Sequence, residues 1–600
     1  MKKKIIAVIL TLCLMISFCV PVFALGIKGS GYSVISHIVD KALGVAHDAI
    51  FFVAQTITKE RNIPSVDEYK NETHDYIYDG TNGLSRGNGW SAGFGSHSVI
   101  PASWRCDAEG KADPNGMCLN CKKATGGYQT KVSKIYTDQL LNLVILSNGS
   151  DKNDNGINDI IIFASVEGVG VTAGTVKDMR SSIEEALKEK GVSHDDILGI
   201  NISSTHCHAG LDTQGMCITT LFNNKLNPFT DYIRSLSEEM ENTLAFAASE
   251  AAKDAFGKIE GGTLSFFKTD KVDGARDKLN SGANTVNKFS CLLFEGRNEK
   301  TIISNIGAHP VSYGAWDNKQ MMCTDYPGFM ALALKDAGYN LVFTQSSQAC
   351  VSSPGIDADA DEIVTDWIES KALSKQDWID RYGKKYADKW YDDLEDSLEG
   401  HMENAAKLAY HILKFIDKAE PVAPTLKVKN TETLISLDYG VMALGSTSGL
   451  LGENVVKYKG TETGYGLFVE TDYIEFGEKI SIITAPGELS PALTFGTDPD
   501  YDGSALWTGE QSWSGEEWKY DTFENMIRQS TGDEDRIVLC FGITNDALGY
   551  MYPDTMPTQS IIAPLLFYKG GPDDMSNCML MTVSTKIGSE LAEAYSVIAE

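Results

Sequence analysis

Residues 197–208 read Ile-Leu-Gly-Ile-Asn-Ile-Ser-Ser-Thr-His-Cys-His, an apolar run that leads directly into two histidines. The length and apolar character of residues 197–203 predict a short, buried strand. On extended backbone, side chains at positions i and i+2 leave the same face, so His206 and His208 can point at one spot beyond the strand. Because only ten histidines occur in 600 residues, this spacing indicates a metal or catalytic site. Two unrelated polar loop residues are the alternative for this motif taken alone.

Three further predicted strands run into side chains that can bind a metal or move a proton. His309 follows residues 301–306, Glu488 follows residues 480–484, and Tyr550 follows residues 537–541. In open α/β sheets, functional sites form beyond the carboxyl ends of the strands. We therefore expect these groups and the histidine pair to gather at one edge of a sheet.

Strands and helices alternate along much of the chain, which predicts an α/β fold with a large mixed sheet and flanking helices. Strands are expected at residues 136–146, 160–166, 197–203, 289–294, 301–306 and 341–344, and helices at residues 172–191, 230–256 and 324–338.

A long helical stretch is expected at residues 366–418, with Trp367, Trp378 and Trp390 as apolar anchors. We interpret this stretch as an insertion or a lid. Two prolines at 421 and 424 then break the pattern. Because candidate site residues lie on both sides of this break, we treat residues 88–600 as one catalytic domain.

The N-terminus has the pattern of a secretory signal peptide over residues 1–24. Three lysines at 2–4 precede an apolar core at residues 5–20, and Val22-Phe23-Ala24 offers small residues for cleavage after Ala24. A lipoprotein signal and an uncleaved anchor are the alternatives. The mature protein is expected to be secreted or at the cell surface, and residues 25–87 form an N-terminal segment of uncertain structure.

The net charge of −30 makes nucleic acid an improbable partner, because such a surface repels phosphate backbones. It does not exclude a neutral or zwitterionic lipid. No segment after the signal peptide has the roughly 20 apolar residues of a membrane span.

Three cysteines, Cys106, Cys118 and Cys121, form a C-x11-C-x2-C pattern in a loop rich in Gly, Asp and Asn. A disulfide staple is the favoured interpretation, since an exported protein permits disulfides. A small structural zinc site is the alternative, and it would need a fourth ligand.

Residues 151–159 resemble the first half of a calcium loop, with Asp151, Asn153 and Asn155 at the spacing D-x-N-x-N-G. A Ca²⁺ site is one interpretation. A solvated hairpin turn is the favoured one, because Asn-Gly and Asp-rich tips suit left-handed backbone, and position twelve of the loop is Ile162 instead of Glu.

Six short segments, in the same order, resemble motifs of neutral (non-lysosomal) ceramidases. They are Thr205-His206-Cys207-His208, similar to T-H-T-H-S-G; residues 308–312 (AHPVS), similar to H-P-x-S; residues 325–329 (DYPGF), similar to D-x-x-G-Y; residues 345–352 (QSSQACVS), similar to Q-S-x-x-G-D-V-S; Pro486-Gly487-Glu488, matching P-G-E; and residues 545–550 (NDALGY), similar to N-x-x-x-G-Y. Each motif is short, but six in order are fairly specific.

The resemblance implies one zinc ion per chain, held by His206, His309, Glu488 and Tyr550, with Tyr552 as a substitute for Tyr550. Two imidazoles, a carboxylate and a phenol oxygen are a plausible zinc set. His208 would then lie outside the ligand shell or donate to the developing oxyanion, a catalytic role for which Tyr550 is the alternative.

Two further catalytic candidates come from the resemblance. Arg276 lies roughly where the family has the arginine of N-R-S-P and would orient the substrate; a surface arginine is the alternative. Ser352 matches the serine of G-D-V-S and, like an unligated histidine, is a candidate general base. The loop departs from the family pattern, because Ala349 and Cys350 replace its Gly and Asp and Ser353 is inserted.

The expected function is therefore a secreted, zinc-dependent amidohydrolase that cleaves an N-acyl, ceramide-like amide bond. The alternatives are a zinc hydrolase for another amide or ester and a non-catalytic surface or binding protein that keeps the fold. Complete family members also carry an immunoglobulin-like C-terminal domain, which we expect to be absent because the sequence ends about 50 residues after Tyr550.

Overall fold

The structure is a computed structural model, and it describes residues 62–120, 124, 126, 132–215, 231–278, 282–313, 320–439, 442–443, 446–447, 454–461, 463–498, 517–556 and 582–599. The expected signal peptide and Cys121 lie outside the described residues. No helix among the described residues is long and apolar enough to cross a membrane.

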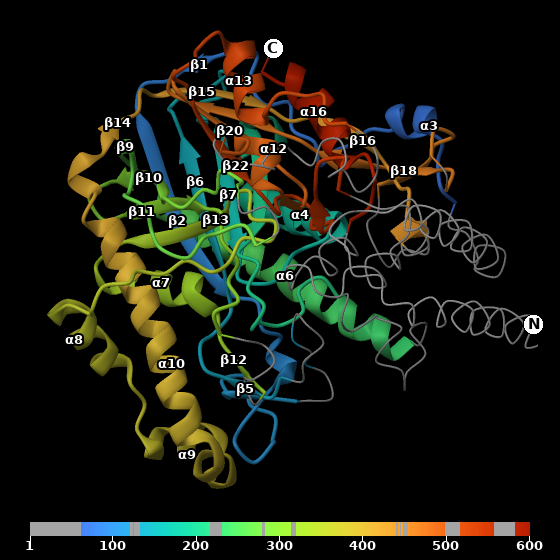
Figure 1. The fold of residues 1–600 in the computed structure, drawn as a ribbon. Coiled ribbons are helices and arrows are strands. Elements are labelled where there is room, and N and C mark those ends of the chain that lie inside the picture. The colour runs from blue at the N-terminus through green and yellow to red at the C-terminus, as the bar shows by residue number, and fades with distance from the viewer. Residues whose placement is uncertain are drawn as a thin grey trace, which may run out of the picture.

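A large mixed sheet organises the fold (Figure 1). Its strands, in spatial order, are β13 (Asn340–Gln345), β11 (Lys300–Ile306), β10 (Ser290–Glu295), β9 (Glu260–Lys268), β2 (Trp90–Ser98), β6 (Leu140–Ser147), β7 (Ile160–Val166) and β8 (Ile197–Ser204), with β14 (Glu420–Pro421) also paired to β9. Only the outermost pairs, β11 with β13 and β7 with β8, are parallel. The sheet is curved enough for β7 and β13 to meet, since the Ser165 hydroxyl donates to the Phe343 carbonyl over 2.5 Å.

A smaller sheet packs against one face of the large sheet. It consists of β1 (Ser85–Arg86), β15 (Thr425–Lys429), β19 (Tyr473–Phe476), β20 (Ile480–Thr484) and β22 (Ile537–Phe541). The core between the two sheets combines Phe163 and Ile303 of the large sheet with Phe476 and Ile482 of the small one. These continuous apolar strands are buried on both faces, which requires helices on the outer sides.

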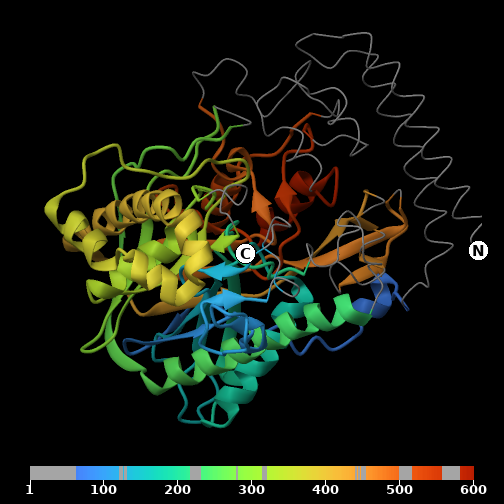
Figure 2. The same cartoon turned by 90° about the horizontal axis from the view of Figure 1, so that it is seen from below.

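Helices cover the outer faces of both sheets, as Figures 1 and 2 show. The helices α4 (Ala173–Lys188) and α6 (Asp231–Gly257) pack on β6 and β7 of the large sheet. The helix α7 (Asp325–Asp336) covers β11 and β13. On the small sheet, α13 (Phe523–Thr531) and α16 (Ile587–Val597) share a core with β20, β22 and the three-stranded sheet β16 (Glu432–Ser436), β18 (Tyr465–Glu470) and β17 (Val455–Lys457).

The α/β fold with a large mixed sheet and flanking helices is confirmed. The strands predicted at 480–484 and 537–541 are observed with those bounds, and the strand predicted at 197–203 is one residue longer. The helix predicted at 172–191 begins at Ala173, because the Thr172 hydroxyl accepts the N–H of Thr175 as an N-cap. The strand predicted from residue 136 begins only at Leu140.

The helical stretch expected at 366–418 is three helices instead of one. These are α8 (Glu362–Lys371), α9 (Lys375–Tyr382) and α10 (Lys384–Leu413). Ser374 begins α9 with a capping box, and Gly383 ends it with a φ of +86° that few other residues adopt without strain.

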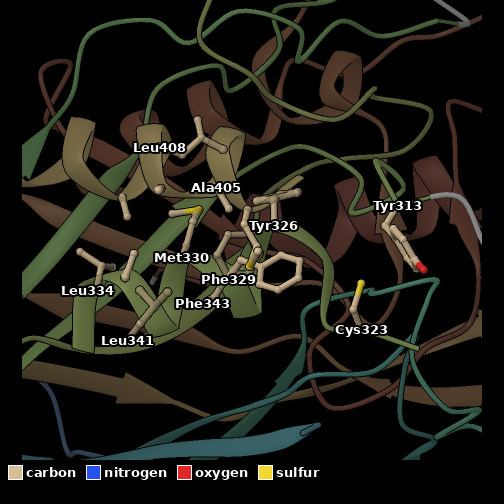
Figure 3. Packing of buried hydrophobic residues seen from close by; sticks show 14 of the residues in the cluster. Tyr313, Cys323, Tyr326, Phe329, Met330, Leu334, Leu341, Phe343, Ala405 and Leu408 are labelled. Carbon is tan, nitrogen blue, oxygen red and sulfur yellow. The ribbon is translucent and has the colours of Figure 1, made fainter. Parts of the chain in front are cut away.

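These helices form a packed wall of the domain. In the cluster of Figure 3, Ala405 and Leu408 of α10 lie against Met330 and Leu334 of α7. Trp378 is fully buried and Trp367 nearly so. Burying these aromatic anchors ties the helices to the core.

The N-terminal part of the described chain docks on the C-terminal half. Ser65 caps the short helix α3 (Val66–Lys70), and Tyr69 stacks on Phe468 with ring centroids 4.4 Å apart. Strand β1 pairs with β15. Residues 62–87 thus belong to the same packed unit as the sheets.

The expected staple does not join Cys106 and Cys118. The two residues are register partners in β3 (Arg105–Cys106) and β4 (Cys118–Leu119), yet no disulfide links them. Instead, the Lys134 ammonium donates to Cys118 Sγ over 3.0 Å. The disulfide interpretation is therefore wrong for this pair.

The loop at 151–159 is a hairpin connection between β6 and β7, as favoured. The Asp151 carboxylate accepts the N–H groups of Asn155 and Gly156. The side-chain amides of Asn153 and Asn155 donate to Asp196 over 3.1 and 2.7 Å. The polar groups that suggested Ca²⁺ thus serve to close the turn and pin it to the neighbouring segment.

Candidate metal centre

The groups predicted to gather at one sheet edge do so. His206 and His208 follow β8, and His309 follows β11. Glu488 and Tyr550 are direct register partners in a short parallel pair, β21 (Glu488–Leu489) with β23 (Tyr550–Met551). All of these segments leave the ends of strands, which explains how residues up to 344 positions apart in the sequence meet in one place.

Glu488 lies between two imidazoles. Its Oε2 is 2.9 Å from Nε2 of His309 and 3.4 Å from Nε2 of His206. Tyr550 hydrogen bonds to the same carboxylate, and its ring stacks on His309. His208 is beside them, with its ring centroid 4.7 Å from that of His206. In the part of the chain that the structure describes, the three histidines form a buried group whose donor atoms lie within 4.8 Å of one another.

Backbone carbonyls orient two of the imidazoles. Nδ1 of His206 lies 2.7 Å from the Val169 carbonyl, and Nδ1 of His309 lies 2.9 Å from the Val351 carbonyl. A carbonyl can only accept, so each Nδ1 carries a proton, while Nε2 of His206 presents a lone pair to the site and Nε2 of His309 lies within hydrogen-bonding distance of the Glu488 carboxylate. This is the outer hydrogen bond that metal-binding histidines usually make.

The buried site shifts the pKa values of its groups toward the forms that bind metals. Burial lowers the pKa of His206, an effect that Glu488 opposes and His309 reinforces. Burial, with His206 and His309, lowers the pKa of His208 well below its usual range. Burial raises the pKa of Glu488, but His206, His309 and Tyr550 together bring it below its usual value. Neutral imidazoles and an ionised carboxylate are the ligating states.

The donor set fits a metal ion. Nε2 of His206 is buried and has no hydrogen-bond partner among the described residues, an arrangement that is costly unless another group fills the position. A cation between Nε2 of His206, Nε2 of His309 and Oε2 of Glu488 would satisfy all three atoms.

Backbone strain concentrates in the loops around these residues. Five of the seven described non-glycine residues with positive φ lie there: His206, Asp325, Cys350, Ile543 and Asn545. Left-handed backbone at a β-branched residue such as Ile543 is a rare outlier. Because strained residues persist only where the surroundings hold them, their clustering supports a functional role for this edge of the sheet.

Glycine at position 487 permits the contact between the two short strands. A Cβ there would lie 2.5 Å from the Gly549 carbonyl oxygen, closer than any ordinary contact. The same carbonyl accepts the N–H of Glu488 over 2.8 Å. Glycine at 487 therefore allows Glu488 to lie beside Tyr550.

Ser352 and Arg276 lie together, but through the backbone. The Ser352 hydroxyl accepts the N–H of Arg276 over 3.1 Å and faces its carbonyl at 3.3 Å. The Arg276 side chain is exposed. The structure thus places Ser352 as a link between two loops.

Cys350 is disulfide-bonded. The Tyr552 hydroxyl donates to its Sγ over 3.1 Å, since a disulfide sulfur has no proton to give. Tyr552 stacks on Tyr550 with centroids 5.6 Å apart. Tyr552 thus lies between the Cys350 disulfide and the Tyr550 ring.

Asp325 is a structural residue that the sequence motif contained without revealing its role. Its carboxylate accepts the Ser312 hydroxyl and the N–H groups of Tyr313 and Tyr326. It thereby anchors the loop that carries His309 to the start of α7. An acidic residue opening a helix was the only available signal.

Glu167 follows β7 and is buried beside the loop that holds His206. Burial raises its pKa to about 8, although the Leu140 N–H and Asn142 amide favour the ion. The folded state therefore keeps a proton that the unfolded chain releases near pH 4.3, so this group makes stability fall between about pH 4.5 and 8, by up to ~1.4 kcal/mol per pH unit.

We expect Glu167→Gln to flatten this pH dependence, because the amide keeps the acceptor for the Leu140 N–H and cannot ionise. Urea unfolding midpoints of the wild type and variant at pH 5 and pH 8 test it. The wild type should lose more stability than the variant on going to pH 8; parallel losses would show that Glu167 is already ionised in the folded state.

Comparison with known proteins confirms the fold. A ceramidase complexed with C2 is similar to this chain with a TM-score of 0.50 and 13% identity, over 85% of this chain and 75% of that one. The neutral ceramidase from Pseudomonas aeruginosa gives a TM-score of 0.46 and 13% identity, over 84% of this chain and 75% of that chain. No protein-family model and no curated protein matches the sequence. The resemblance seen in the motifs thus extends to a shared fold at remote identity.

Proposed function

We propose that this protein is a secreted, zinc-dependent amidohydrolase that cleaves an N-acyl, ceramide-like amide bond. The observation that carries the proposal is the convergence of two Nε2 atoms on one carboxylate oxygen, at 2.9 and 3.4 Å. Zinc–ligand distances of 2.0–2.1 Å in a tetrahedron place neighbouring donor atoms about 3.3 Å apart. The two measured separations lie on either side of that value.

The proposed ligands are His206, His309, Glu488 and Tyr550, with one zinc ion per chain. Tyr550 qualifies because it already contacts Glu488 and stacks on His309. His208 is proposed to lie outside the ligand shell. Zinc bound there would lower the pKa of a water ligand to about 7 and polarise the amide carbonyl.

The protein's own side chains would carry out the proton transfer. Glu488 is committed to the site by its contacts with both histidines, so it is poorly suited to carry a proton. His208 is buried and neutral, because its pKa lies well below the usual range. It can accept a proton from the attacking water and return it to the leaving amine. Ser352 is the weaker candidate base because its hydroxyl bonds to the backbone of Arg276.

Secretion is supported by two independent features. Residues 1–24 have the pattern of a signal peptide, and Cys350 forms a disulfide, a bond that persists mainly in oxidising compartments. A lipid amide is the proposed substrate class because the fold is similar to that of a ceramidase.

A zinc hydrolase for another amide or an ester is the second candidate. It is favoured by the loop at Cys350, where a disulfide replaces the family's aspartate beside the proposed site. The two candidates share the metal and differ in the substrate.

The test is metal analysis of the purified mature protein, followed by hydrolysis assays on a ceramide, an N-acyl amino acid and a carboxylic ester, with and without a chelator. We expect about one zinc per chain and chelator-sensitive release of fatty acid from ceramide. Release from another substrate alone would favour the second candidate. A protein that neither contains zinc nor takes it up would contradict both.

A further inference from the structure

The side chain of Gln345 lies between the loop that carries His206 and the loop that carries His309 and bonds to both. It ends strand β13, and its side chain is fully buried. Its Nε2 donates to the Thr205 carbonyl over 2.8 Å and to the Ala308 carbonyl over 2.9 Å. Its Oε1 accepts the Ala308 N–H over 3.2 Å. Thr205 and Ala308 are the residues immediately before His206 and His309.

The sheet itself does not fix the distance between these histidines. His206 follows β8, which ends the path of paired strands, whereas His309 follows β11 near the opposite end. The hydrogen-bonded ladder between them runs through the whole large sheet. A small change of twist at each pair would therefore accumulate between the two imidazoles. Residues 542–545 bond to the backbone of both β8 and β13 and shorten this path, and the His208 N–H donates to the Pro310 carbonyl over 3.3 Å. The Gln345 side chain adds the contact that bonds to the residues immediately before both His206 and His309.

Only a carboxamide of this length satisfies the three partners. Two carbonyls require two N–H donors, and one N–H requires an acceptor, which is the inventory of a primary amide. Glutamate would face two carbonyl oxygens with a carboxylate, methionine would bond to none of the three groups, and asparagine is one methylene too short. Because the group is buried, any unmet partner carries a desolvation cost.

We propose that Gln345 is a positioning residue that sets the spacing of His206 and His309, and thereby the affinity of the site for its metal. The inference rests on the proposed function, since it concerns the same two ligands. Gln345 touches neither imidazole and acts through the backbone that carries them.

The test uses Gln345→Met, which keeps the volume and removes the hydrogen bonds. Zinc affinity is measured by competition with a chromophoric chelator, and the visible spectrum of the Co²⁺-substituted protein reports ligand geometry. We expect a ~10–100-fold loss of affinity, the usual effect of removing an outer hydrogen-bond partner, and a shifted Co²⁺ spectrum.

Gln348→Met is the matched control. Gln348 lies three residues away and is equally buried, but neither its Nε2 nor its Oε1 has a hydrogen-bond partner among the described residues. We expect unchanged zinc affinity and an unchanged Co²⁺ spectrum. A loss equal to that of Gln345→Met would overturn the inference, because it would show a general effect of altering the loop.

Tyr326→Phe provides a second route if Gln345→Met does not fold. The Tyr326 hydroxyl is another donor to the Ala308 carbonyl, over 2.7 Å, and its loss should lower zinc affinity by a smaller factor. Unaltered affinity in the folded variant overturns the inference. A wild-type protein that binds no zinc would refute the proposed function instead, so the two failures are distinguishable.

Discussion

His206→Ala is expected to lose its zinc and to hydrolyse amides no faster than the background reaction. The variant removes one of the two proposed imidazole ligands and also the hydrogen bond to the Val169 carbonyl. The loss of affinity should exceed the ~10–100-fold typical of an outer-shell partner. Metal content after dialysis and the rate of fatty-acid release measure both effects.

His208→Ala is the informative counterpart, because its imidazole is equally buried and lies in the same loop. If His208 carries the proton and does not bind the metal, the variant keeps its zinc and loses ~10²–10⁴-fold in rate. The pair of variants therefore separates ligand from proton carrier by comparing metal content with turnover.

A three-histidine site is the competing arrangement, since the donor atoms of His206, His208 and His309 lie within 4.8 Å of one another. In that case His208→Ala would lose zinc as His206→Ala does, and Glu488→Gln would keep it. We expect the reverse, because Oε2 of Glu488 already lies at tetrahedral separations from two imidazoles. Zinc loss in His208→Ala together with zinc retention in Glu488→Gln would contradict the proposed ligand set.

The position of this site could be predicted from the sequence because its side chains follow strands that the sequence also predicts. Residues 480–484 and 537–541 are continuous apolar runs, and the structure begins and ends both strands at those residues. A buried strand leaves little freedom in where its end lies. Glu488 and Tyr550, a few residues further along, were therefore placed correctly at the sheet edge.

The supporting contacts were not readable, and the reasons are physical. Val169 and Val351 hold the histidines through carbonyls that every residue possesses. The role of Gln345 could not be predicted, because it depends on the curvature of the sheet that brings β13 near β8. The break in the long helical stretch at Gly383 depends on a single positive φ. Sequence periodicity reports burial along one element, whereas these contacts join elements far apart in the chain.

Arg180→Met is expected to destabilise the protein by about 3–5 kcal/mol, the usual cost of breaking a buried ion pair. The Arg180 guanidinium on α4 binds both carboxylate oxygens of Glu470 on β18. It also donates to the Ile200 carbonyl on β8 and the Tyr76 carbonyl. Both charged side chains are less than a tenth exposed. One side chain thus joins a helix of the large sheet to the three-stranded sheet.

Most of the lost stability should come from Glu470, whose carboxylate stays buried without its partner. Without Arg180, Glu470 would be buried near Asp472 and Asp546, whose pKa values burial already raises, with a contribution from Glu470. The loss of stability in the variant should therefore be largest at neutral pH, where a buried carboxylate without its cation is most costly, and shrink toward pH 4.

Two further variants serve as controls, and the midpoint of urea unfolding is measured for each. Arg86→Met removes an ion pair with Glu478 in which both side chains are mostly exposed, and it should leave the midpoint unchanged. Arg180→Met combined with Glu470→Leu removes both charges and should recover most of the loss, because two apolar side chains leave no buried charge unpaired. If the double variant is as unstable as Arg180→Met alone, the destabilisation arises from lost contacts with the Ile200 and Tyr76 carbonyls, and the charge argument is wrong.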